Sequence, residues 1–236
     1  MSAPHETGQM GVPIGQMGAD SRADFITRTY NHLMGAIVAF VGIELLLFGS
    51  GLAGTIAETL LSLPFGWITV LGGFMLVGWL AQNVAIKSES MSSQYMALGA
   101  YVLAEAIIFV PLLYIANSVA PGVISSAAIV TLLGFAGLTA VVFTTRKDFS
   151  FLGSFVRFGF ILAIVAIVAA TIVGFHMGTW FSVAMIGLAG AAILYDTSNV
   201  LHHYPEDRYV AASLSLFASV AVLFWYVLQL FLSADD

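Results

Sequence analysis

Seven long apolar stretches constrain the fold of this chain more than any other feature of its sequence. A transmembrane helix needs about 20 mostly apolar residues, and the stretches have that length. They cover residues 26–48, 65–86, 94–116, 123–143, 151–173, 180–201 and 209–232. Only 8% of the 236 residues are charged, whereas soluble domains carry about 25%. The sequence therefore predicts an all-α integral membrane protein, a bundle of seven transmembrane helices.

The remaining segments read as turns, a short helix and a tail. Glycine, proline or charged residues separate the apolar stretches, as in Gly49-Ser50-Gly51 and Pro121-Gly122. Residues 52–63 are too short to span a membrane, and we expect a short interfacial helix there, or a simple loop. Residues 1–24 are polar and rich in glycine, which favours a flexible cytoplasmic tail before one transmembrane domain over residues 25–236.

The basic residues predict the orientation of the bundle. Lysine and arginine near the ends of spans mark the cytoplasmic side. With seven spans all basic residues fall on one side, whereas six spans would scatter them. We therefore expect a cytoplasmic N-terminus and a C-terminus outside. The residues are Arg22, Arg28, Lys87, Arg146, Lys147, Arg157 and Arg208.

The last stretch carries small residues on one helix face, namely Ala211, Ser215 and Ser219, which recur every four positions. Small residues let helices approach closely inside a membrane. This pattern predicts that the last helix is packed at the centre of the bundle. The alternative is a lipid-facing helix that is rich in alanine.

The sequence lacks the residues and motifs that several classes of function require. The chain has no cysteine, which excludes disulfides and thiolate metal sites, and its 7 basic residues give no footprint for nucleic acid. Phosphate-binding loops and hydrolase motifs are missing. His202 and His203 are adjacent and point apart on a helix, and no third ligand is near them in the sequence, so we expect neither a metal site nor a cofactor. An enzyme is not expected.

Asp196 is the first candidate for function, because a carboxylate inside a span is energetically costly and usually faces a cavity or the bundle interior. Arg157 lies at a similar depth in the fifth stretch. The two residues can form a proton-controlled latch, since a nearby cation favours the ionised carboxylate. The alternatives are a static ion pair, or an Arg157 that extends to the lipid headgroups.

Two glutamates are candidate pore carboxylates. Glu105 lies near the middle of the third stretch with no basic residue at its depth, and Glu44 lies toward the outer end of the first. A buried carboxyl group must be protonated, hydrogen-bonded or hydrated. Glu105 fits a functional or a structural role equally well, while Glu44 is shallow enough to reach the interface.

Five short segments, which form three matches, resemble the transmembrane Bax inhibitor motif family. The chain is similar to that family over most of its length and in the same seven-span order. The segments are Tyr195-Asp196-Thr197 with Tyr209-Val210-Ala211-Ala212 and Leu214-Ser215-Leu216-Phe217, then the run from Thr144 to Gly153, and Arg28-Thr29-Tyr30. In the run from Thr144 to Gly153, Asp148 or Ser150 is expected to cap the following helix.

The resemblance implies a seven-helix bundle with a central last helix and, for several members, a pH-dependent leak of calcium or other cations. Their sensor is a pair of aspartates with an arginine lock on the second helix. Asp196 matches the first aspartate, but Ser219 stands at the second, and residues 65–86 contain no arginine. One carboxylate binds calcium less well than two. Ser219 can donate a hydrogen bond to Asp196, and Arg157 is a hypothetical replacement for the lock.

Two functions follow as expectations. The first is a pH-influenced calcium or cation leak with a degraded carboxylate sensor, which requires a hydrated path linking Asp196, Glu105 and Glu44. The second is a non-conducting regulatory protein that binds another membrane complex, since some bacterial relatives resemble modulators of a membrane protease. That function requires dry, paired carboxylates. In either case the bacterial character of the chain favours the inner membrane.

Overall fold

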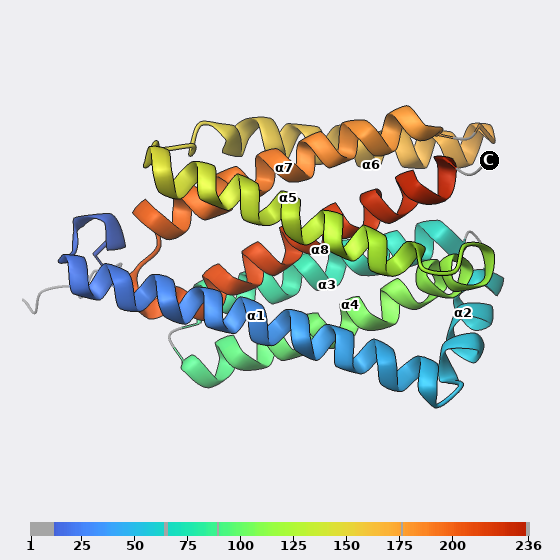
Figure 1. Cartoon of the computed structure of the whole chain (residues 1–236), viewed down its shortest axis with the longest axis horizontal. Coiled ribbons are helices and arrows are strands. Elements are labelled where there is room, and N and C mark those ends of the chain that lie inside the picture. The colour runs from blue at the N-terminus through green and yellow to red at the C-terminus, as the bar shows by residue number, and fades with distance from the viewer. Residues whose placement is uncertain (1–11, 64–65, 89, 176, 235–236) are drawn as a thin grey trace, which may run out of the picture.

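The computed structural model describes residues 12–63, 66–88, 90–175 and 177–234, and these residues form helices and no strand. Each apolar stretch corresponds to one long helix (Figure 1). The helices are α1 (Ala19–Gly49), α2 (Leu52–Ser62), α3 (Gly66–Lys87), α4 (Met91–Val119), α5 (Val123–Thr145), α6 (Leu152–Val173), α7 (Thr179–His202) and α8 (Tyr209–Ala234), with short 3-10 helices at Ile14–Gln16 (η1) and Glu206–Arg208 (η2).

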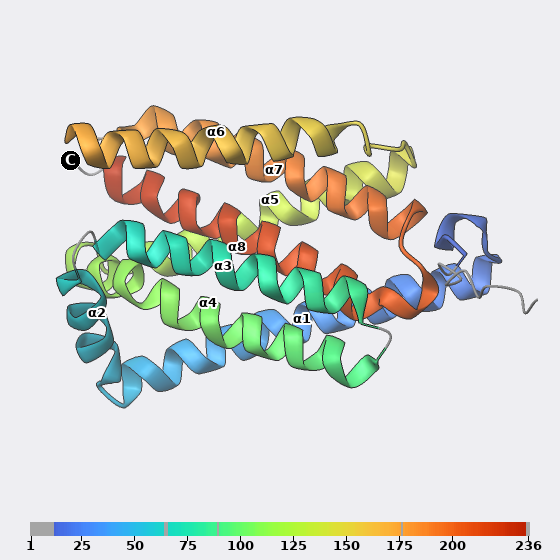
Figure 2. The ribbon, with the colours of Figure 1, turned by 180° about the vertical axis from the view of Figure 1, so that it is seen from behind.

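Within the described ranges, 6 helices are long and apolar enough to cross a membrane, namely α1 and α4 to α8. The chain is therefore an all-helical integral membrane protein. Helix α3 has 22 residues and lies beside the other long helices (Figure 2). Helix α2 is the short helix expected between the first two stretches, and Gly51, with a φ of 80°, makes the turn that leads into it.

Helix α8 forms the centre of the bundle, as its small residues predict. It packs against α1, α3, α4, α5 and α7, and both views show it surrounded by them (Figures 1 and 2). Its apolar window is 89% buried, whereas that of α6 is 11% buried. Ala211, Ser215 and Ser219 are all buried, so the small-residue face lies inside the protein and not against lipid.

Residues 12–24 differ from the expected flexible tail. Helix α1 begins at Ala19, and η1 packs against the α7–α8 connection. The Ile14 side chain is fully buried, and its N–H donates to the Tyr204 carbonyl at 2.9 Å. The Arg22 guanidinium donates to the Gly15 carbonyl at 2.7 Å. These contacts hold the segment on the bundle, while residues 1–11 lie outside the described part of the chain.

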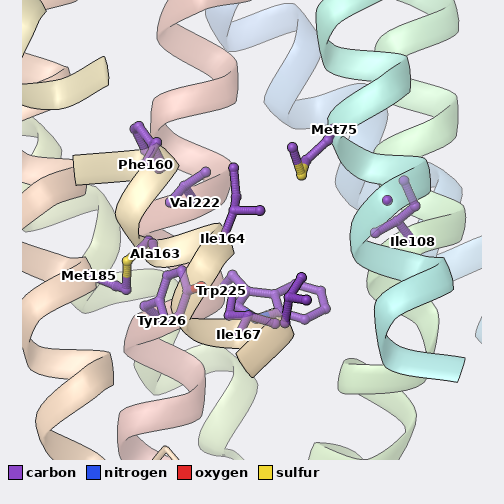
Figure 3. A pocket seen from close by; sticks show the side chains of 12 residues that line it. Met75, Ile108, Phe160, Ala163, Ile164, Ile167, Met185, Val222, Trp225 and Tyr226 are labelled. Carbon is purple, nitrogen blue, oxygen red and sulfur yellow. The ribbon is translucent and has the colours of Figure 1, made fainter. Parts of the chain in front are cut away.

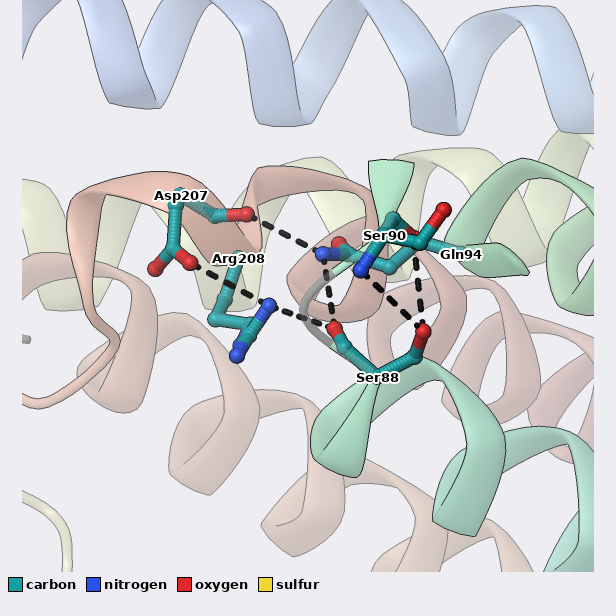
Figure 4. A network of polar contacts seen from close by, with 5 residues as sticks. All are labelled: Ser88, Ser90, Gln94, Asp207 and Arg208. Carbon is teal, nitrogen blue, oxygen red and sulfur yellow. Dashed lines mark hydrogen bonds and ion pairs between the residues drawn. The ribbon is translucent and has the colours of Figure 1, made fainter. Parts of the chain in front are cut away.

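A polar network joins two connections at the same end of the bundle (Figure 4). The Arg208 guanidinium donates to the Ser88 carbonyl at 2.6 Å. The Gln94 amide donates to the carbonyls of Ser88 and Asp207, at 3.3 Å in each case. The α3–α4 connection is thereby tied to η2, directly before the central helix begins.

Helix α6 is held mainly by α7, and two glycines allow the close approach. A Cβ atom at Gly159 would lie 2.5 Å from Leu188 Cδ1, and one at Gly153 would lie 2.7 Å from Tyr195. These neighbours are side-chain atoms, so a small substituent can be accommodated by a rotamer change, but a branched one cannot. The close α6–α7 contact therefore depends on glycine, which has no side chain, at positions 153 and 159.

We expect Gly159→Val to destabilise the protein by about 1–3 kcal/mol, the usual range for overpacking a well-packed contact. The measurement is unfolding in mixed detergent micelles, followed by circular dichroism. Gly137→Val on α5 is the matched control, because a Cβ atom at Gly137 meets nothing within 4 Å. Equal losses in both variants would show that helix propensity, and not the α6–α7 contact, sets the effect.

Candidate functional site

The site is built on a hydrogen bond between the two helices that end the chain. Asp196 lies near the end of α7 and Ser219 lies on α8. The Ser219 hydroxyl donates to Asp196 Oδ2 at 2.5 Å. Both helices pack closely along their length, and the small side chain of Ser219 leaves room for the carboxylate. The hydrogen bond expected between these residues is therefore present.

Asp196 and Ser219 face a cleft of about 550 Å³ that is lined by residues of α3, α4, α6, α7 and α8. Among the other polar side chains that line it are Gln82, Asn83, Ser215, Tyr101 and Tyr195. The Tyr204 hydroxyl lies 3.0 Å from the Ser215 hydroxyl. Burial raises the pKa of Tyr204 well above its usual range, so the phenol stays neutral and available for this hydrogen bond. The cleft can thus hold water or a cation beside the carboxylate.

Arg157 does not pair with Asp196, in contrast to the predicted latch. The ion pairs of the described residues are Asp24–Arg28, Asp148–His203 and Asp207–Arg208. Val156 and Phe160 of α6 line the cleft, and Arg157 is turned about 100° from Val156 around the helix. The Arg157 side chain is exposed, which agrees with the alternative that it extends to the lipid headgroups.

The two candidate pore carboxylates lie apart from the cleft. Glu105 is fully buried on α4, and Glu44 is 7% exposed on α1. Neither residue lines the cavity that holds Asp196. No carboxyl oxygen of either residue makes a hydrogen bond of good geometry with the described residues. The Tyr101 hydroxyl is nevertheless a polar neighbour of Glu105, and Tyr101 lines the cleft. The three acids therefore do not share one cavity, and the pore roles of Glu105 and Glu44 stay predictions.

An apolar cavity of about 200 Å³ adjoins the cleft along α8. The two share Met75, Phe160 and Val222 in their walls. Ile164 and other apolar side chains of α6 line one side of this cavity, and Met75 of α3 faces them (Figure 3). The space between α3 and α6 is thus polar near Asp196 and apolar farther along α8.

The α5–α6 connection folds onto the end of α7. Asp148 Oδ1 accepts hydrogen bonds from the Ser150 N–H at 2.8 Å and from the Ser198 hydroxyl at 3.3 Å. Its Oδ2 lies 3.5 Å from His203 Nε2. Helix α6 has no side-chain cap, so the expected cap by Asp148 or Ser150 is wrong. Asp148 instead pairs with His203 and lies near His202, with donor atoms of the three residues within 4.8 Å of one another.

The fold and this site define a class: a helical integral membrane protein with an acid–serine pair between its last two helices. Residues 22–236 match the family described as "Inhibitor of apoptosis-promoting Bax1". The chain belongs to this Bax inhibitor family, which confirms the resemblance seen in its sequence.

Three relatives illustrate the family. The chain is 32% identical over 181 residues to "Modulator of FtsH protease YccA" of Escherichia coli, covering 74% of this chain and 78% of that protein. It is 39% identical over 112 residues to an uncharacterized protein of Pseudomonas aeruginosa. This match covers 46% of this chain and 49% of that protein, about half of each. It is 29% identical over 114 residues to Bax inhibitor 1 of Schizosaccharomyces pombe, covering 46% and 41%.

Proposed function

We propose that this chain is a non-enzymatic regulator in the bacterial inner membrane that binds a membrane-bound protease. The observation that carries the proposal is the state of the carboxylates. Asp196 is engaged by Ser219 at 2.5 Å, and Glu105 and Glu44 lie outside its cavity. A conducting path needs the three acids along one hydrated route, and they do not line one common cavity. Of the dry, paired carboxylates expected for an interaction protein, only the Asp196–Ser219 pair is found among the described residues, so the regulator is favoured by the missing common route.

Two further observations support the proposal. The relative named as a modulator of FtsH protease aligns with 74% of this chain, and a protein of another E. coli strain with the same identity and coverage is named "Inner membrane protein YccA". The apolar cavity between α3 and α6 offers a place for an apolar side chain from a helix of the protease that packs on this face. Packing of that kind holds helices together in membranes.

We also propose seven spans with a cytoplasmic N-terminus. Helix α3 has 22 residues, enough to span a bilayer. The helix ends that carry the 7 basic residues gather at one end of the bundle, opposite the C-terminus (Figure 1). By the positive-inside rule this end faces the cytoplasm. Cysteine-labelling of Ser88→Cys and Ser118→Cys in sealed vesicles tests the orientation, because only Ser88→Cys should be protected from an impermeant reagent added from the periplasmic side.

The regulatory proposal is tested by degradation of a reporter membrane substrate in proteoliposomes that contain an FtsH-type protease. We expect degradation to slow several-fold when the wild-type chain is co-reconstituted. Ile164→Trp, which fills the apolar cavity, should lose this effect. Val165→Trp is the matched control on the neighbouring, 58% exposed position of α6 and should keep it. The same degradation rate with and without the chain would contradict the proposal.

A cation leak is the second candidate function, favoured by one observation. The cleft beside Asp196 has about 550 Å³ and carries the polar side chains of Gln82 and Asn83. A hard cation such as calcium needs several oxygen ligands. The cleft offers the Asp196 carboxylate, the hydroxyls of two serines and the two side-chain amides. Ion flux into liposomes separates this candidate from the first.

A further inference from the structure

We propose that Asp148, His202 and His203 form a binding site for a zinc-type transition-metal ion where the α5–α6 connection meets the end of α7. One donor atom from each of the three residues lies within 4.8 Å of the others. The site is separate from the Asp196 cleft and does not depend on the proposed regulatory function. It brings together two segments that are distant in the sequence.

The spacing of the donors is close to what a small metal ion requires. Zinc binds imidazole nitrogen at about 2.0–2.1 Å in tetrahedral geometry, which places neighbouring donors roughly 3.3–3.5 Å apart. His203 Nε2 and Asp148 Oδ2 are 3.5 Å apart. The donor atom of His202 lies within 4.8 Å of the other two, so the three donors must draw slightly closer together to bind an ion.

The donors are oriented by hydrogen bonds of the kind that support metal ligands. His202 Nδ1 lies 2.9 Å from the Ser198 carbonyl, and because a carbonyl only accepts, Nδ1 carries the proton and Nε2 keeps its lone pair. Asp148 uses Oδ1 for Ser150 and Ser198, which leaves Oδ2 free. Such partners fix the ring tautomer and the carboxylate orientation in metal sites.

The type of donor selects the metal. Two imidazoles and one carboxylate suit zinc and neighbouring transition metals, whereas calcium and magnesium prefer sites made of oxygen. The N–H of Ser150 holds the pKa of Asp148 below its usual range, so the carboxylate is ionised at neutral pH. The side chains of His203 and Asp148 are 46% and 50% exposed, which leaves a fourth position for water and a path for the ion.

Zinc binding to the full chain tests the proposal directly. The protein is purified in detergent without a polyhistidine tag, treated with a chelator, and titrated with Zn²⁺ against a chromophoric competitor. We expect one Zn²⁺ per chain and no competition from Ca²⁺. His203→Ala and Asp148→Asn should each weaken binding by on the order of 100-fold or more. Ser198→Ala removes the hydroxyl that orients Asp148 and that also accepts from the Phe149 N–H, and it should weaken binding by about 10–100-fold.

His32→Ala is the matched control, since this histidine bonds to Tyr95 at 2.8 Å and lies on α1. It should bind Zn²⁺ like the wild type. A second readout is the visible spectrum of the Co²⁺-loaded protein, which reports nitrogen ligation even if a variant loses stability. No zinc binding by the wild type, or binding that survives His203→Ala with an unchanged cobalt spectrum, would overturn the proposal.

Discussion

Replacing Ser219 by aspartate is expected to turn a non-conducting chain into a pH-dependent cation leak. In liposomes loaded with a calcium-sensitive dye, the wild type should give no influx above protein-free liposomes. Ser219→Asp should raise influx several-fold. The rate should change between about pH 6 and pH 8, because two adjacent carboxylates repel each other when both are ionised and protonation of one removes the repulsion. The substitution places a second carboxylate where a hydroxyl now lies 2.5 Å from Asp196.

Two effects act together in this variant. Ionised carboxylates repel one another and push α7 away from α8, which opens the cleft. They also provide more oxygen ligands for calcium than the single carboxylate of the wild type. The proton that relieves the repulsion closes the helices again, so the flux should fall as the pH is lowered.

Ser219→Asn is the control for this experiment, since it has nearly the same size as aspartate and carries no charge. It should leave the liposomes tight. Influx through the wild type that disappears in Asp196→Asn would contradict the regulatory proposal and favour a leak with a single carboxylate. Tight liposomes with every variant would show that the scaffold does not conduct at all.

Replacing Glu105 by methionine is expected to stabilise the protein, by about 1–3 kcal/mol in the free energy of unfolding. The glutamate is fully buried, and neither of its carboxyl oxygens makes a hydrogen bond of good geometry in the described structure, since its interaction with the neighbouring Tyr101 hydroxyl is poorly aligned. An unsatisfied buried polar group costs about 1–3 kcal/mol, and methionine fills a similar volume without that cost. Glu105→Lys should instead destabilise by several kcal/mol, because it buries an unpaired charge.

Unfolding in mixed detergent micelles measures both changes. Glu58→Met on α2 is the matched control, because Glu58 is exposed and surface substitutions usually stay within about 0.5 kcal/mol. A clear loss of stability in Glu105→Met would show that the carboxyl group has a partner. A stabilised variant that no longer slows proteolysis or alters flux would identify Glu105 as a functional acid retained at the expense of stability.

The hydropathy of the sequence was sufficient to predict the helices. The last stretch, 209–232, corresponds to α8 at Tyr209–Ala234, and the fifth, 151–173, to α6 at Leu152–Val173. Length and composition determine a span directly, because the membrane leaves no other way to satisfy the backbone. The small residues of α8 also indicated its central position, since their spacing on one face is a local property of the sequence.

Contacts between distant segments could not be predicted in the same way. Depth alone suggested that Arg157 meets Asp196, but depth does not fix the rotation of α6, and the structure turns Arg157 outward. The proximity of Asp148 to His203 depends on how the α5–α6 connection folds back over α7, with Ser198 hydrogen-bonded across 50 positions of sequence. The Asp196–Ser219 hydrogen bond could be predicted only because the family resemblance matched these two residues to the paired aspartates of other members.

The position of α8 has a consequence for how the protein is made. The helix that fills the middle of the bundle follows in the chain all five of the helices it packs against. During synthesis, the earlier helices enter the membrane before their common packing partner exists. Until α8 is inserted, the contacts that these helices make with it cannot form. The centre of the bundle therefore closes only after its five partner helices have been made.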